Sequence, residues 1–208
     1  MSSFSMSQGK QAKVLTDPQV RTALQFLASS RHQLRDRTIL LLSVRAGLRA
    51  KEIASLTWRM VTDAQGIIGT IIALEDIASK GRSGRTIPIS KDLREVLTQL
   101  QAHEAAKRAE TGFTLKPAAN VITSERDERL NPNSVAHWFK RLYASLGFDG
   151  CSSHSGRRTA ITKWARNVSR VGGSLRDVQE LAGHSSLQTT QRYVQGDTQA
   201  KRRLVDMV

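Results

Sequence analysis

The hydrophobic positions of the chain are spaced three and four residues apart over most of its length, which is the repeat of helices with one buried face. The first helix is predicted to begin at residues 16–19, where a threonine, a proline and a glutamine are typical of a capped helix start. A strongly apolar helix is predicted over residues 34–46, ending at Gly47, and a short helix follows it. Further helices are predicted after residue 90, from Asn131-Pro132, and over residues 153–168, 174–182 and 186–195. The apolar positions that carry most of these predictions are Val20, Leu24, Leu27, Ile53, Leu56, Leu93, Val96, Leu97, Leu100, Val135, Phe139, Leu142 and Leu146.

Residues 58–90 follow a different pattern. β-Branched residues are concentrated there and glycines interrupt them, which is typical of short strands joined by tight turns. The residues concerned are Ile67, Ile68, Ile71, Ile72, Ile87 and Ile89, with Gly66, Gly81 and Gly84. The predicted fold class is therefore mixed α/β and mostly helical, with a small antiparallel three-stranded sheet that has a hairpin near residues 81–84.

Length and composition fit a single globular domain with a short tail. The chain has 208 residues, of which 39% are hydrophobic, enough to bury a core. Residues 1–14 are predicted to form a flexible N-terminal tail, and residues 15–208 the domain. The single cysteine, Cys151, excludes an internal disulfide and a four-cysteine zinc site. The apolar runs are too short for a membrane span, and the N-terminus is a poor signal peptide, so we expect a cytoplasmic protein.

The charge is large and unevenly distributed. The net charge is +14. Residues 1–60 carry 10 basic and 3 acidic side chains, residues 151–208 carry 10 and 4, and the part between is close to neutral. A fold that brings the two ends together would give one basic face. A charge of this size indicates a polyanionic partner, of which nucleic acid is the commonest.

Two candidate cations lie in the first half of the chain. Arg49 follows Gly47 where the apolar helix meets the short one, and Glu52, three residues on, is close enough to orient it. Lys80 lies in or beside the predicted hairpin. Taken alone, the first fragment is better explained as a surface arginine–glutamate pair, and the second as a solvated lysine.

The second half adds two histidines, an arginine and a tyrosine. His154 and Arg157 are spaced i, i+3 at a helix start, so both side chains fall on one face. His184 follows Gly183, again at a predicted helix start, and Tyr193 comes nine residues later. Nine residues of helix span about 13 Å, so the two side chains would meet only if the helix bends back or a third element bridges them. Taken alone, Tyr193 is best explained as a half-buried helix tyrosine.

In this order, these residues resemble the motifs of the tyrosine recombinases, also called the phage integrase family. The motifs are GLRAKE at 47–52, Lys80 before a glycine-bearing turn, HSGR at 154–157, LAGH at 181–184, and TTQRYV with Tyr193. The resemblance covers residues 15–208 and implies the catalytic-domain fold of that family. Two features depart from it. Only about 14 residues stand where most members carry a separate DNA-binding domain, and Ser155 and Gly156 replace a larger pair.

The resemblance also implies a reaction. Tyr193 would be the nucleophile, and Arg49, Arg157 and His184 would stabilise the phosphate. His154 would help to accept the tyrosine proton, Lys80 would protonate the leaving 5′ oxygen, and Glu52 would support Arg49. DNA would be cut and rejoined through a 3′-phosphotyrosine, without metal, cofactor or ATP. This is the reaction of a site-specific integrase or invertase.

The same resemblance predicts the partners: double-stranded DNA sites and a homotetramer in the synaptic complex, formed from chains that are monomers off DNA. The apolar end of residues 197–208 fits either a C-terminal helix that docks onto a neighbouring protomer or a tail packed on its own domain. Location in the cytoplasm, at the nucleoid, would follow in a prokaryotic or phage context.

Three other functions remain open at this stage. A type IB topoisomerase-like enzyme would share the cleavage step, but nothing in the chain resembles a large DNA-wrapping domain. A non-catalytic DNA-binding regulator on the same fold would require the loss of a catalytic residue, and none is lost. An RNA-binding protein has little support, since aromatic residues make up only 5% of the chain.

Overall fold

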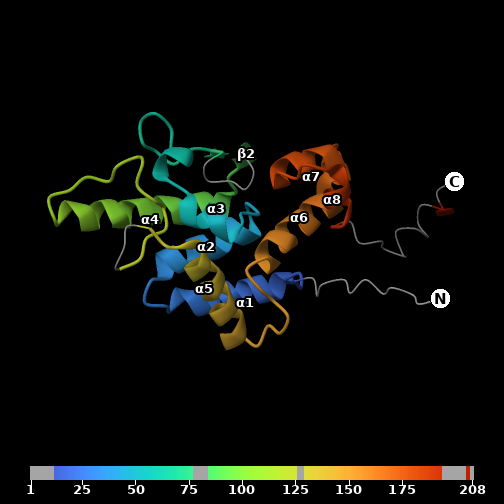
Figure 1. Ribbon diagram of the computed structural model, residues 1–208, viewed down its shortest axis with the longest axis horizontal. Coiled ribbons are helices and arrows are strands. Elements are labelled where there is room, and N and C mark those ends of the chain that lie inside the picture. The colour runs from blue at the N-terminus through green and yellow to red at the C-terminus, as the bar shows by residue number, and fades with distance from the viewer. Residues whose placement is uncertain (1–11, 77–83, 126–128, 194–204, 207–208) are drawn as a thin grey trace, which may run out of the picture.

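The computed structural model describes residues 12–76, 84–125, 129–193 and 205–206, and these are mostly helical. Five helices form the larger body of the domain: α1 (Asp17–Ala28), α2 (Gln33–Val44), α3 (Ala50–Ser55), α4 (Lys91–Ala109) and α5 (Pro132–Ser145). Three more follow: α6 (Ser155–Asn167), α7 (Leu175–Ala182) and α8 (Leu187–Gln191). Short 3-10 turns, η1 (Trp58–Met60) and η2 (Val168–Val171), complete the helical elements of the described part. Helices α7 and α8 lie to one side of the body, and α6 runs between the two (Figure 1).

The helix starts largely follow the sequence prediction. Thr16 caps α1 with a full capping box and a proline in the first turn. The buried residues of α4 are the four predicted ones, Leu93, Val96, Leu97 and Leu100. The last helix is shorter than predicted, because α8 ends at Gln191 and the backbone N–H of Tyr193 donates to the carbonyl of Thr190 in a turn.

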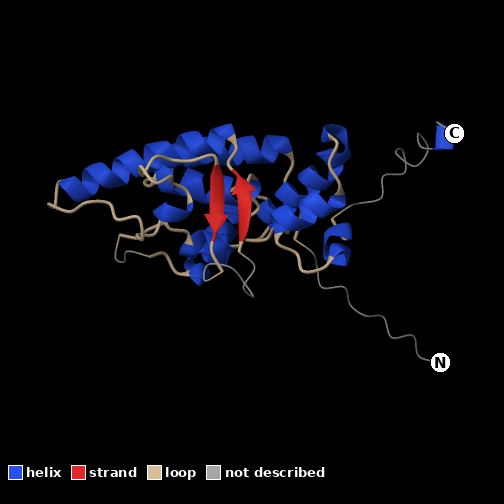
Figure 2. Ribbon diagram, turned by 90° about the horizontal axis from the view of Figure 1, so that it is seen from above, coloured by secondary structure: helices blue, strands red, loops and turns tan. Residues whose placement is uncertain are grey.

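The described sheet has two strands, β1 (Ile71–Leu74) and β2 (Arg85–Pro88), which pair antiparallel with Ile71 opposite Pro88 (Figure 2). The prediction of a third strand is wrong for the described residues. The stretch before β1 forms a tight turn in which the Asp63 carboxylate accepts the backbone N–H groups of residues 65 and 67. These donors are then not available to a strand ladder, and a single bridge between residues 62 and 68 remains.

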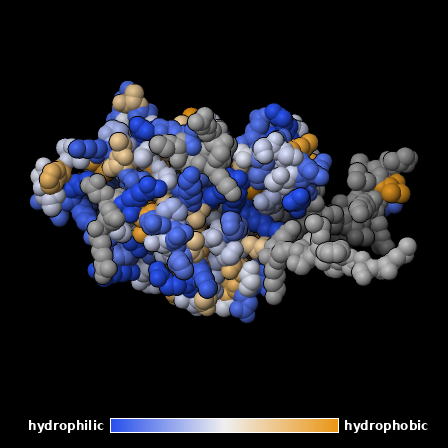
Figure 3. All heavy atoms as spheres, in the orientation of Figure 1, coloured by the Kyte–Doolittle hydropathy of each residue, from blue (hydrophilic) through white to orange (hydrophobic). Residues whose placement is uncertain are grey.

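Two hydrophobic clusters hold the domain together. The larger lies under α1–α5 and the sheet, where Trp58, Phe139 and Tyr143 are its largest fully buried side chains. The smaller contains Ile161, Val178 and Ala182, with partly buried side chains, Tyr193 among them, packed against it. Of the three tryptophans expected in the core, Trp58 is buried, while Trp138 and Trp164 are half-buried and pack against the larger and the smaller cluster respectively. The face in Figure 3 is mainly hydrophilic, with apolar side chains scattered over it.

The chain ends differ from the prediction at one point. Residues 12–14, predicted as part of the tail, belong to the described structure, and the Lys13 N–H donates to the Gly150 carbonyl. The next residue, Leu15, is buried and donates its N–H to the Thr159 hydroxyl on α6. The predicted docking helix at 197–208 lies outside the described residues, except for residues 205–206. Within the described part of the chain, no helix has the length and apolar character to cross a membrane.

Gly156 explains one departure from the family's motifs. A Cβ at this position would lie 2.8 Å from the Cβ of Ser43 and 3.2 Å from Cγ1 of Val44, both on α2. Only a residue without a side chain therefore allows α6 to approach α2 this closely. Gly156 directly precedes Arg157, so this contact also sets how far the arginine reaches toward the body of the domain.

Gly156→Ala is expected to lower the free energy of unfolding by about 1–3 kcal/mol, the usual cost of adding a methyl group to a filled contact. Gly69→Ala is the matched control, because a Cβ there would meet its nearest atom, the Val61 carbonyl oxygen, at an ordinary 3.7 Å. Urea melts of the two variants and the parent protein measure the difference. Equal stability of the two variants would contradict a close α2–α6 contact.

Candidate active site

Arg49 occupies the turn between α2 and α3. Gly47, with φ of +64°, allows the chain to reverse there, and Arg49 becomes the N-cap of α3. Glu52 holds Arg49 in two ways. Its Oε2 accepts the Arg49 backbone N–H at 2.8 Å, and its Oε1 accepts the Arg49 Nη1–H at 2.7 Å. The predicted contact between Arg49 and Glu52 is therefore present.

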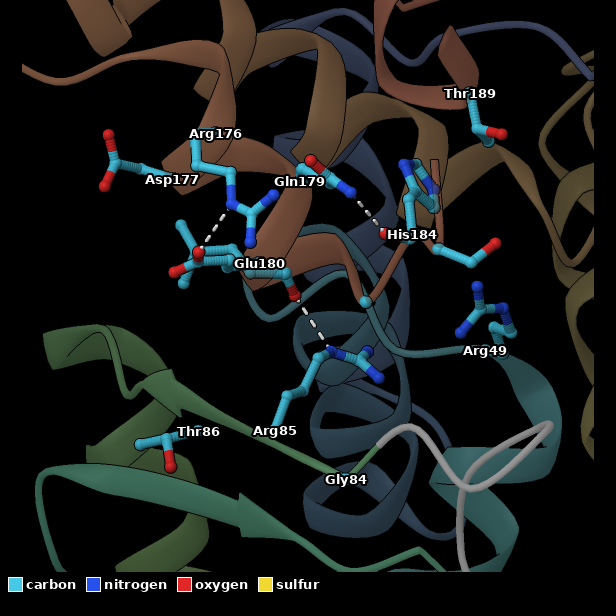
Figure 4. A pocket seen from close by; sticks show the side chains of 13 residues that line it. Arg49, Gly84, Arg85, Thr86, Arg176, Asp177, Gln179, Glu180, His184 and Thr189 are labelled. Atoms are coloured by element: carbon cyan, nitrogen blue, oxygen red, sulfur yellow. Dashed lines mark hydrogen bonds and ion pairs between the residues drawn. The ribbon is translucent and has the colours of Figure 1, made fainter. Parts of the chain in front are cut away.

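Arg85, at the start of β2, was not among the predicted site residues. Its Nη1 and Nη2 donate to the two oxygens of Glu52 at 3.0 and 3.1 Å. Its Nε donates to the Leu181 carbonyl on α7 at 2.9 Å (Figure 4). The Arg85 side chain is only 6% exposed. Its position in the strand could have indicated that Arg85 is buried, because Arg85 lies on the same face as the buried Ile87, two residues further on.

Glu52 is fully buried between these two arginines. Burial by itself would raise the pKa of its carboxyl group. The hydrogen bonds and charge of Arg85, with those of Arg49, outweigh burial and bring the pKa below its ordinary value. Glu52 is therefore an anion at neutral pH that holds two cations in fixed positions.

Arg157 is 4% exposed and lies at the junction of α6, α7 and the α2–α3 turn. Its Nη1 donates to the Gly47 carbonyl at 2.6 Å, and its Nη2 donates to the Ala182 carbonyl at 2.7 Å. Burial, and then the nearby charge of Arg49, lower the pKa of Arg157 to about 10. The side chain therefore stays positively charged at neutral pH, held by two backbone carbonyls.

His184 and Tyr193 lie side by side. Gly183, with φ of +60°, ends α7, and His184 lies in the turn that leads to α8 instead of at a helix start as predicted. Residues 184–186 form a turn, and α8 after it has only five residues. The chain therefore folds back, and no straight nine-residue helix separates the two rings. The ring centroids are 5.4 Å apart and the planes lie within 24° of each other. The spacing in the sequence required the chain to bend back for His184 and Tyr193 to meet, and it does.

His154 is the N-cap of α6, and its side chain is exposed. It lines a cavity of about 490 Å³ together with Arg49, Arg157, His184 and Tyr193. Five of the six predicted catalytic residues therefore line one cavity, although 144 residues separate the first from the last. The sixth, Lys80, lies outside the described residues.

The cavity is strongly basic. Arg158 and Arg192 line it as well, and Cζ of Arg158 lies 5.9 Å from the centroid of the Tyr193 ring. A larger cavity of about 990 Å³ adjoins it, sharing Arg49, His184 and Thr189, and continues past Arg85 and Arg176 (Figure 4). Guanidinium groups bind the oxygens of a phosphate well. Among the described residues, no group of three or more His, Cys, Asp or Glu side chains could hold a metal ion.

Comparison with known proteins decides the family. Residues 13–200 match the sequence profile described as the phage integrase family. This chain belongs to the phage integrase family. It is 28% identical over 160 residues to tyrosine recombinase XerC of Syntrophus aciditrophicus, covering 77% of this chain and 48% of the relative. It is 31% identical over 159 residues to tyrosine recombinase XerD of Pseudomonas putida, covering 76% and 49%.

The fold agrees with this family assignment. The integrase of transposon Tn1549, solved in complex with a circular intermediate DNA, superimposes with a TM-score of 0.70 at 17% identity, covering 96% of this chain and 67% of that one. The predicted fold, that of a tyrosine recombinase catalytic domain, is confirmed, with two described strands instead of three. The chain spans about half the length of the curated relatives it matches.

The environment of His184 predicts a pH dependence of stability in this family member. Burial, followed by the charges of Arg157, Arg49 and Arg85, lowers the pKa of His184 to about 4 from an ordinary 6.5. The unfolded chain therefore takes up a proton at this residue at a higher pH than the folded chain does. Stability is expected to decrease as the pH falls from about 6.5 toward 4. Carboxylates with lowered pKa values, such as Glu52, add to the loss only below about 4.5.

The measurement is a series of thermal melts between pH 7.5 and 4.5, for the parent chain and for His184→Gln. The variant lacks the titrating group, so its Tm should fall less over this range. Parallel curves for the two proteins would show that His184 titrates alike in the folded and unfolded states.

Proposed function

We propose that this chain is the catalytic domain of a site-specific DNA recombinase that cuts and rejoins DNA through a bond between Tyr193 and a 3′ phosphate. The observation that supports this most is that Tyr193, His184, Arg157 and Arg49 line the same basic cavity. A tyrosine hydroxyl beside fixed cations can attack a phosphodiester without help from a metal ion.

The cations would act on the phosphate. In the transition state of the attack, extra negative charge develops on the non-bridging oxygens. Arg49 and Arg157 would donate hydrogen bonds to these oxygens, and His184 would add a third donor. The arginines are held in advance by Glu52 and by backbone carbonyls, so little reorganisation would be needed when the charge develops.

The proton and the leaving group complete the reaction. The Tyr193 oxygen would form a bond to phosphorus while the bond from phosphorus to the 5′ oxygen breaks. His154 would help to accept the phenolic proton, and Lys80 would give a proton to the 5′ oxygen. Attack by a 5′ hydroxyl from a second DNA strand would reverse these steps, so that the phosphotyrosine bond is exchanged for a new phosphodiester without ATP.

The proposed partners are double-stranded DNA sites bound by four copies of the chain during strand exchange, with monomers off DNA. The net charge of +14 supports a nucleic-acid partner. Residues 197–208 are proposed to dock onto a neighbouring copy. A protein with this substrate would act in the cytoplasm, at the nucleoid.

The test is a suicide substrate, a nicked DNA duplex whose cleaved fragment diffuses away before rejoining. A panel of candidate sites from the DNA surrounding the gene would be incubated with the protein in EDTA and without ATP. The expected result is a protein–DNA adduct that survives SDS and is destroyed by protease. Tight binding to a site on which no adduct forms would favour a non-catalytic DNA-binding regulator, and relaxation of supercoiled plasmid without site preference would favour a topoisomerase.

A further inference from the structure

Both ring nitrogens of His184 have a partner. Nε2 lies 3.1 Å from Nη2 of Arg157, and Nδ1 lies 2.9 Å from Oγ1 of Thr190. Thr190, on α8, is fully buried, so water does not compete for this second contact. The ring is thus held between an arginine that borders the cavity and a hydroxyl behind it.

These partners determine where the proton of His184 lies. A guanidinium group only donates hydrogen bonds, so Nε2 must accept from Arg157. In a neutral imidazole the proton then sits on Nδ1, which donates to the Thr190 hydroxyl. The ring is neutral at pH 7 because burial disfavours its charged form, and because Arg157 on α6, Arg49 at the N-cap of α3 and Arg85 on β2 act against a further positive charge. Tyr193 stacks on its face.

This arrangement conflicts with the role that His184 has in the proposed function, on which the following inference rests. To donate to a phosphate oxygen, Nε2 must carry a proton. A hydroxyl, unlike a carbonyl or a carboxylate, can either accept or donate. We infer that Thr190 is a positioning residue whose hydroxyl supports both tautomers of His184, accepting from Nδ1 in the free protein and donating to Nδ1 when Nε2 donates to the phosphate.

The exchange is balanced in protons. His184 loses the proton on Nδ1 to solvent and gains one from solvent on Nε2, so its charge does not change. The ring is only half-buried, so a brief opening of the contact between Nδ1 and Thr190 lets both protons exchange with solvent. The Thr190 hydroxyl turns its own hydrogen toward Nδ1. The phosphate oxygen takes over the hydrogen bond of Arg157, which releases the lone pair of Nε2 for protonation.

The first test uses the free protein and needs no reaction. Nitrogen-15 NMR of the histidine side chains distinguishes the two tautomers, and His184→Gln identifies the signals of His184 among the five histidines. The expected result is a proton on Nδ1 in the parent, in Thr190→Ser and in Thr190→Val, because Arg157 donates to Nε2 in all three. A parent protein with its proton on Nε2 would overturn the inference.

The second test measures single-turnover adduct formation on the suicide substrate, with DNA affinity and Tm measured in parallel. Thr190→Val should react about 10–100-fold more slowly at unchanged DNA affinity, and Thr190→Ser should recover most of the rate. A Thr190→Val protein that is folded and reacts at the parent rate would refute the role of the hydroxyl while leaving the proposed function intact. If the parent forms no adduct, the proposed function fails, and the NMR experiment still decides which tautomer His184 has in the free protein.

Discussion

Tyr193→Phe is expected to abolish the SDS-resistant adduct with a suicide DNA substrate while leaving DNA binding nearly unchanged. The substitution removes only the hydroxyl oxygen that would bond to phosphorus. The ring can still pack against His184, with its centroid at 5.4 Å, and against the small cluster of Ile161, Val178 and Ala182. The measurements are adduct yield on a denaturing gel and affinity by fluorescence anisotropy.

The other tyrosine of the chain provides a matched control. Tyr143 is fully buried in the larger cluster, and its hydroxyl has no hydrogen-bond partner among the described residues. Tyr143→Phe should therefore keep full adduct formation and a Tm equal to or above that of the parent, because it removes an unpaired buried polar atom. Adduct formation by Tyr193→Phe, or its loss in a folded Tyr143→Phe protein, would contradict the assignment of the nucleophile.

Substitution of Arg157 is expected to have the second largest effect. Arg157→Ala should reduce cleavage by at least about 10²–10³-fold, the usual cost of losing one fixed donor to a developing oxyanion. It should also destabilise the fold, since the carbonyls of Gly47 and Ala182 lose their donor at a cost of about 1–3 kcal/mol each. Cleavage must therefore be measured well below the Tm of the variant.

Arg157→Lys separates the two effects. Lysine keeps the charge, but its single ammonium nitrogen cannot bind two carbonyls and a phosphate at once, as the planar guanidinium group of arginine can. Cleavage should therefore remain low while DNA affinity stays close to that of the parent. Single-turnover rates and binding isotherms on one substrate give both quantities. A parallel loss of affinity and rate in both variants would make Arg157 a DNA-binding residue without a specific part in the reaction.

Local patterns were sufficient for most of the secondary structure. The repeat of Leu93, Val96, Leu97 and Leu100 predicts α4 because a helix buries one face, and residues 16–19 predict the start of α1 because the capping bonds form within one turn. The third strand failed for a local reason that composition did not reveal. The Asp63 side chain takes the N–H groups of residues 65 and 67, which a strand would need.

The sequence by itself determined the types and the order of the candidate site residues, and these were enough to identify the family. It also placed Arg49 and Glu52 within one turn of each other. The tertiary structure decided the remainder of the candidate site. Arg85 reaches Glu52 across 33 residues and Leu181 across 96, and the turn at residues 184–186 with the short α8 brings His184 against Tyr193. Charge and burial set the neutral state of His184 and the buried cation at Arg157. Both charge states depend on groups that are distant in the chain and close in space, and no local sequence pattern can encode them.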